Sequence, residues 1–125
     1  MMKIAWYRRQ SVWVILSFLF MLAILLHSMK TGTGTGRPSS IKQVIYNFAH
    51  VPAYMVLTIL LFNAIRSQTL TWAIFVSAAY GVFIEYVQSF NPGRTASVMD
   101  EGLNIVGIVI AAILIRKGMF NFTKR

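Results

Sequence analysis

Four apolar segments account for most of this 125-residue chain, at residues 11–28, 44–65, 70–90 and, beginning at 98 or 103, up to 115. A helix that spans a bilayer needs about 20 apolar residues, which the second and third segments provide and the first and fourth nearly reach. Backbone polar groups in lipid must be satisfied within the segment, and none of the four segments has the alternation of a barrel strand. We therefore predict an all-α integral membrane bundle of four transmembrane helices.

The amino-acid composition agrees with a membrane protein. Hydrophobic residues make up 57% of the chain and charged residues only 12%, whereas a soluble domain carries about 25% charged residues. The first apolar segment could instead be a signal peptide, because Lys3, Arg8 and Arg9 precede it. No A-x-A-like cleavage site follows it, so we expect it to remain as a membrane span.

Polar stretches divide the chain into three regions. Residues 31–40, TGTGTGRPSS, are typical of a turn-rich loop that cannot contribute to a core. The first region, 1–42, therefore holds one transmembrane helix and this Gly/Thr-rich loop. The second region, 43–118, holds the other three helices, and the third, 119–125, is a basic cytoplasmic tail.

Positive charge is concentrated on one side of the predicted bundle. The chain has 12 Lys and Arg and 3 acidic residues, for a net charge of +9. Most of the Lys and Arg residues lie near the two termini or between the second and third segments. The positive-inside rule therefore predicts a multi-pass protein of the cell inner membrane with both termini in the cytoplasm. We expect the cations to contact anionic lipids and not nucleic acid, because they lie between apolar segments rather than along one aromatic-rich face.

The acidic residues, in contrast, gather on the opposite side. Glu85, Asp100 and Glu101 fall within residues 85–101, and a carboxylate at the centre of a bilayer costs about 3 kcal/mol or more. Helical spacing places further polar residues on the faces that end at this depth. We call this set the polar cluster and expect it to bind a ligand; its members are His50, Tyr54, Glu85, Gln88, Arg94, Asp100 and Asn104.

Some of these residues have a structural alternative. His50 and Tyr54 could hydrogen-bond the backbone carbonyl that Pro52 leaves open, because proline has no N–H to donate to it. Glu85 and Arg94 could form an ion pair that only fixes the turn between their helices.

The last apolar segment offers alternatives of the same kind. Asp100 and Asn104 could cap its helix, since polar and acidic side chains favour helix N-termini. We expect Glu101 to be a solvated residue of the first helical turn. We expect Gly107 and Ala111 to serve close helix packing rather than ligand contact, because small residues let helices approach each other in lipid.

Two ordered motifs carry a family resemblance. The pattern E-x-x-Q-x-x-x-P-G-R-x-x-S-x-x-D-x-x-x-N-x-x-G spans residues 85–107, and H-x-x-x-Y-x-x-L spans residues 50–57. Together they resemble the VanZ-like family of small bacterial membrane proteins over residues 45–115. The resemblance implies a multi-spanning protein of the cell envelope, and the founding members of that family are associated with low-level resistance to teicoplanin-type glycopeptides.

Three functions are compatible with these residues. In the first, the polar cluster recognises an anionic headgroup at the outer leaflet, such as that of a lipid-linked envelope precursor. Arg94 binds this headgroup through two hydrogen bonds from its guanidinium group. In the second, His50 with Glu85 or Asp100 forms an acid–base pair that acts on a lipid headgroup. In the third, the cluster only joins helices or binds a partner, with homo-oligomerisation left open.

We expect neither a metal nor a cofactor. The chain has no cysteine, which excludes a thiolate metal site, a disulfide and a cysteine nucleophile. His50 and the acidic residues lack a zinc-ligand spacing such as H-E-x-x-H.

Overall fold

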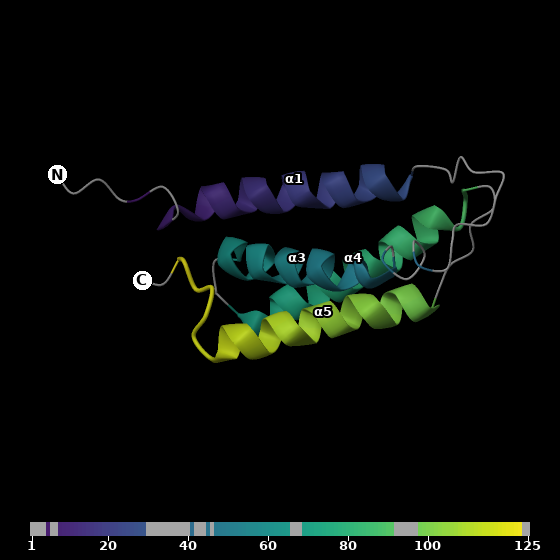
Figure 1. Ribbon diagram of the computed structural model, residues 1–125. Coiled ribbons are helices and arrows are strands. Elements are labelled where there is room, and N and C mark those ends of the chain that lie inside the picture. The colour runs from purple at the N-terminus through teal and green to yellow at the C-terminus, as the bar shows by residue number, and fades with distance from the viewer. Residues whose placement is uncertain are drawn as a thin grey trace.

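Antiparallel helices make up most of the described part of the computed structural model (Figure 1). The structure describes residues 5, 8–29, 41, 45, 47–65, 69–91 and 98–123. The helices are α1 (Gln10–Ser28), α3 (His50–Ala64), α4 (Leu70–Gln88) and α5 (Val98–Arg116). Because they alternate in direction, the beginning of α1 and the end of α5 lie at the same end of the bundle. The predicted all-helical fold is confirmed for these residues.

Three of the helices are long and apolar enough to cross a membrane. Helices α1, α4 and α5 have 19 residues each, which corresponds to about 28 Å at 1.5 Å per residue. Helix α3 has 15 residues, or about 22 Å, and falls short of the roughly 30 Å hydrocarbon core. The predicted bundle of four spanning helices is therefore confirmed for three of its members, and the segment predicted at 44–65 gives the shorter helix His50–Ala64.

Pro52 accounts for the interruption of the helix just before α3. Regular helix is interrupted at Ala49 and begins again at His50, which puts Pro52 in the first turn, where its missing N–H is not needed. Helical hydrogen bonds continue on both sides of the interruption. The Ala49 N–H donates to the carbonyl of Ile45 at 3.1 Å, and the Ala53 N–H donates to the carbonyl of Ala49 at 3.2 Å.

Helix α3 lies at the centre of the bundle and contacts α1, α4 and α5. Most of its residues from Tyr54 to Ala64 are buried, as expected for a helix that is apolar on all sides. The outer helices instead expose large apolar side chains, such as Phe18 and Leu22 on α1 and Phe75 on α4. Such extended apolar surfaces suit contact with lipid chains.

Gly107 lets α5 approach α3 closely. A methyl group at Gly107 would overlap the carbonyl oxygen of Val51 and come within 3.1 Å of the backbone nitrogen of Met55. Ala111, one turn further along α5, is fully buried. The interpretation of these two small residues as packing positions is therefore confirmed.

Beyond α5, the chain folds back onto the bundle. Gly118 adopts a φ of 85°, the left-handed conformation that commonly ends a helix. The buried Asn63 of α3 then donates its amide N–H to the carbonyl of Phe120 at 2.8 Å and accepts the N–H of Phe122 at 2.9 Å. The ring of Phe122 stacks on Trp13 of α1 at 5.1 Å between centroids. The described part of the predicted tail is thus anchored to α1 and α3.

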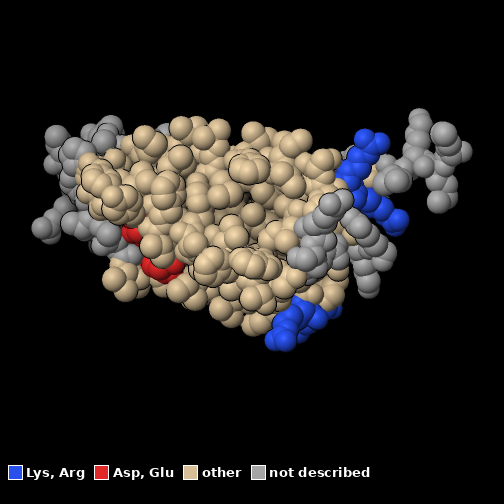
Figure 2. All heavy atoms as spheres, turned by 180° about the vertical axis from the view of Figure 1, so that it is seen from behind, with Lys and Arg blue, Asp and Glu red and all other residues tan. Residues whose placement is uncertain are grey.

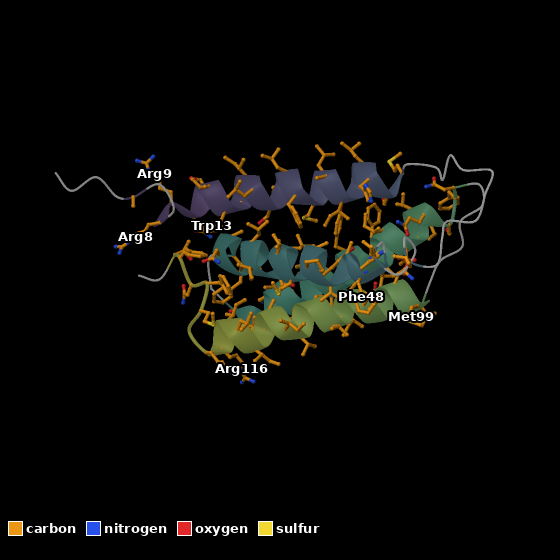
Figure 3. The ribbon with its side chains drawn as sticks, in the orientation of Figure 1. Arg8, Arg9, Trp13, Phe48, Met99 and Arg116 are labelled. Carbon is orange, nitrogen blue, oxygen red and sulfur yellow. The ribbon has the colours of Figure 1, made fainter. Side chains whose placement is uncertain are left out.

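The two ends of the bundle differ in charge. Arg8, Arg9 and Arg116 lie at the end where α1 begins and α5 ends, whereas Phe48 and Met99 lie at the opposite end (Figure 3). The space-filling view shows the described Lys and Arg at one end and the acidic side chains toward the other (Figure 2). This separation follows the charge asymmetry of the sequence.

Candidate functional site

The start of α3, the end of α4 and the start of α5 lie at the end of the bundle remote from the described basic residues (Figure 1). His50 is the first residue of α3, Gln88 is the last of α4, and Asp100 lies in the first turn of α5. Helices that alternate in direction therefore carry polar residues far apart in sequence to one place. The site forms because each of these residues sits at a helix terminus.

A hydrogen-bonded network joins α3 to α5. His50 Nδ1 lies 2.8 Å from Asn104 Oδ1, and Asn104 Nδ2 donates to Glu101 Oε2 at 3.1 Å. The amide oxygen of Asn104 only accepts hydrogen bonds, so the imidazole must donate in its contact with this oxygen. Nδ1 of His50 therefore carries a proton, and the other ring nitrogen, Nε2, lies 4.0 Å from Asp100 Oδ2. We call this chain of contacts the His50–Asn104–Glu101 network.

The site has a buried layer and a more open layer. Asn104 is 1% exposed, and Glu85 and Gln88 are also buried. The side chains of His50 and Asp100 are 16% and 22% exposed. His50 and Asp100 are therefore the more accessible residues of the site, while Asn104 is enclosed and bonded to the imidazole.

The structure corrects the expectation that Glu101 is solvated. Its side chain is half-buried and accepts the amide of Asn104, because Gly81 of α4 leaves room for it. A methyl group at Gly81 would come within 2.7 Å of Glu101 Oε2. The i, i+3 spacing of Glu101 and Asn104 is the sequence signal that could have identified this contact.

The remaining members of the polar cluster differ in how they are placed. Tyr54 is 2% exposed, and its hydroxyl finds no hydrogen-bond partner among the described residues. Glu85 and Gln88 are buried on α4, and Arg94 lies outside the described residues. The alternative in which His50 only bonds the backbone near Pro52 does not match the structure, because both ring nitrogens of His50 face α5.

An apolar cavity of about 550 Å³ adjoins this site. His50, Tyr54 and Gln88 belong both to the polar cluster and to the cavity wall. The rest of the wall includes residues of α1, among them Phe20 and His27. Sequence reasoning missed α1 because spacing within a helix does not show which neighbour packs against it.

The arrangement suits hydrogen bonding rather than metal coordination. Within the described part of the chain, no three His, Asp or Glu side chains are placed to hold a metal ion. What the site offers is an imidazole of fixed orientation, a nearby carboxylate and a buried tyrosine hydroxyl next to an apolar space. Polar groups set beside an apolar space are characteristic of a small-molecule site.

The fold and the site define a small helical protein whose apolar helices fit a membrane and whose buried polar residues gather at one end of the bundle. The chain belongs to the VanZ/LLP1 family, whose model matches residues 1–121. The match extends the resemblance seen over residues 45–115 to include α1. No curated protein and no solved structure matches the chain significantly.

Proposed function

We propose that this chain is an inner-membrane protein of the bacterial cell envelope that recognises an anionic, lipid-linked headgroup at the outer leaflet. The observation that carries the proposal is the His50–Asn104–Glu101 network, together with Asp100, at a helix-terminal end of an otherwise apolar bundle. Ionisable groups within membrane helices are costly and are most often retained for function. The headgroup would bind at His50 and Asp100, the more exposed members of the site.

Arg94 supplies the positive charge that an anionic headgroup needs. The acidic residues of the site repel an anion, so His50 alone would not hold a phosphate. In the sequence, Arg94 stands between α4 and α5, three positions after Asn91 and four before Val98. Its planar guanidinium can bind a phosphate or carboxylate through two parallel hydrogen bonds.

A direct test compares two lipids with the same acyl chains. We expect the purified chain, in bilayer discs of mixed phosphatidylglycerol and phosphatidylcholine, to retain the anionic lipid at least tenfold more often than the zwitterionic one. Native mass spectrometry of the protein released from the discs measures this ratio. Equal retention of the two lipids would contradict anionic headgroup recognition.

The orientation of the bundle is a second expected result. The described cations, Arg8, Arg9, Arg116 and Lys117, lie at helix ends that the positive-inside rule assigns to the cytoplasm. An alkaline phosphatase fused after Arg125 should therefore be inactive, and one inserted in loop 31–40 should be active. The opposite pattern would place the site on the cytoplasmic face and exclude the outer leaflet.

Family membership connects this proposal to glycopeptides. If the bound headgroup belongs to an envelope precursor, producing the chain in a teicoplanin-sensitive bacterium should raise teicoplanin tolerance about twofold to fourfold. Such a small change matches the low-level resistance of the founding family members. Tolerance that does not change would separate headgroup binding from any role against glycopeptides.

Acid–base catalysis on a lipid headgroup is the second candidate, favoured by the fixed orientation of the His50 imidazole. With Nδ1 donating to Asn104, Nε2 is the nitrogen left to exchange a proton with a substrate. An enzyme would turn over lipid, whereas a recognition protein would release it unchanged. Thin-layer analysis of lipids incubated with the wild-type chain and with His50→Gln distinguishes the two.

A further inference from the structure

The apolar cavity beside the polar cluster is built from three helices. Its volume of about 550 Å³ lies within the 300–1,000 Å³ that small-molecule sites occupy. Helix α1 supplies one wall, the first turns of α3 with the preceding Ile45 and Ala49 supply the second, and the end of α4 supplies the third. The cavity therefore lies at the same end of the bundle as the His50–Asn104–Glu101 network.

The wall of the cavity is mostly apolar and includes buried and exposed residues, and we call the buried ones its floor and the exposed ones its rim. Ile84 and Tyr54 form part of the floor and are each 2% exposed. Ala23 of α1 and Ala49 at the start of α3 lie at the rim and are exposed. Ile45, also at the rim, is 66% exposed. A hydrocarbon chain that entered past the two alanines would reach the buried side chains of the floor, which the surrounding lipid cannot contact.

Two observations identify the occupant as hydrocarbon with a polar group attached. The rim adjoins exposed apolar side chains, including Leu22 and Leu26 of α1, so the opening faces lipid chains when α1 spans the membrane. Tyr54 lines the cavity one helical turn from His50, and its hydroxyl is buried without a partner among the described residues. A buried hydroxyl without a hydrogen bond is destabilising, and an ester or phosphate oxygen next to a headgroup could accept its hydrogen.

From this geometry we propose that the cavity holds one hydrocarbon chain of the lipid whose headgroup binds the polar cluster. The inference rests on the proposed function and extends it, because it assigns chain recognition to α1 and headgroup recognition to α3 and α5. His50 lies at the junction, since it lines the cavity and also bonds Asn104. A lipid would bind with its polar end at the network and its chain between α1 and α3.

Photolabelling at a buried residue tests the proposal. In bilayer discs that contain phosphatidylglycerol with a diazirine in its acyl chain, we expect illumination to label Ile84, which annular lipid cannot reach. Phe75, which is 63% exposed on the same helix, reports annular lipid in the same sample. Labelling of Phe75 without Ile84 would overturn the proposal.

Filling the cavity from its rim provides the matched variants. Ala49→Trp and Ala23→Trp replace exposed residues, so both should fold, and each should lower labelling of Ile84 at least fivefold while Phe75 is unchanged. Ala79→Trp, at an exposed position of α4 outside the cavity, should leave both labels unchanged. Ile84 labelling that survives both rim variants would also overturn the proposal.

Two further experiments identify the type of hydrocarbon chain that binds and separate this inference from headgroup recognition. In the first experiment, unlabelled diacyl phosphatidylglycerol and a polyprenyl phosphate are added as competitors. The stronger competitor shows whether the cavity prefers an acyl or an isoprenoid chain. Failure of both to compete counts against a specific site. A phosphatidylcholine probe with the same diazirine chain is then used. Equal labelling of Ile84 by both probes would support the chain site while contradicting anionic headgroup selectivity.

Discussion

Replacing Gly107 by leucine should prevent α5 from packing on α3 and leave little folded protein. A single added methyl group would already overlap the carbonyl oxygen of Val51, and the backbone there cannot rotate away as a flexible side chain could. Overpacking of a well-packed interior costs about 1–3 kcal/mol, so Gly107→Ala should lower stability by an amount in that range and Gly107→Leu by more. Thermal unfolding in detergent, followed by circular dichroism, measures both changes.

Gly102 provides the matched control on the same helix. A Cβ added at Gly102 would meet no atom within 4 Å, so the same substitutions there introduce no overlap. Alanine at an exposed helical position is favoured over glycine by about 1 kcal/mol, so Gly102→Ala should be neutral or stabilising. If Gly107→Leu unfolds at the same temperature as Gly102→Leu, α5 does not pack on α3 as described.

Replacing Asn104 by leucine should disrupt both structure and binding. Leucine has a similar size but can bond neither His50 nor Glu101. Each buried polar group that loses its partner costs about 1–3 kcal/mol, and more when it is charged. We therefore expect stability to fall by several kcal/mol and retention of phosphatidylglycerol to fall at least tenfold. Ile105→Leu, at an exposed neighbouring position, should change neither quantity.

A double-mutant cycle measures whether His50 and Asn104 stabilise the protein through the hydrogen bond between them. If His50 and Asn104 act through a single hydrogen bond, His50→Leu combined with Asn104→Leu should cost less than the sum of the single changes, by about 0.5–3 kcal/mol. Strictly additive costs would mean that the two residues are not coupled, and the His50–Asn104–Glu101 network would lose its support.

Apolar segment length predicted the helices well because membrane helices are limited chiefly by hydrophobic length. The predicted segment 11–28 differs by one residue from α1 at Gln10–Ser28, and the predicted start at residue 70 is that of α4. Within the predicted segment 44–65, the described residues 45, 47 and 48 are helical, but the helix is interrupted at Ala49 and α3 itself begins at His50. The missing N–H of Pro52 explains this interruption, which the apolar pattern does not show.

The helical spacing of polar residues identified part of the site. It placed Asp100 and Asn104 on the face of α5 that meets His50, as the contacts show. It assigned Glu101 to solvent, because the room that Gly81 leaves on α4 depends on the packing of two helices. The cavity wall on α1 could not be predicted, since α1 carries few polar residues that would indicate its orientation.

The central claim is that the polar cluster binds a ligand and does more than hold helices together. Removing the charges of Glu85 and Arg94 together, as Glu85→Gln with Arg94→Gln, tests it most directly, because neither of these two charges is left without the other. Arg94 lies outside the described residues, so its role here follows from the sequence alone. Circular dichroism of the purified double variant reports folding, and native mass spectrometry reports retained phosphatidylglycerol.

We expect a folded protein whose preference for the anionic lipid is lost. We expect Arg94→Lys to lose most of this preference as well, because lysine lacks the planar guanidinium group that forms two parallel hydrogen bonds. A folded double variant that keeps the full wild-type preference would contradict the claim and leave the cluster with a purely structural role.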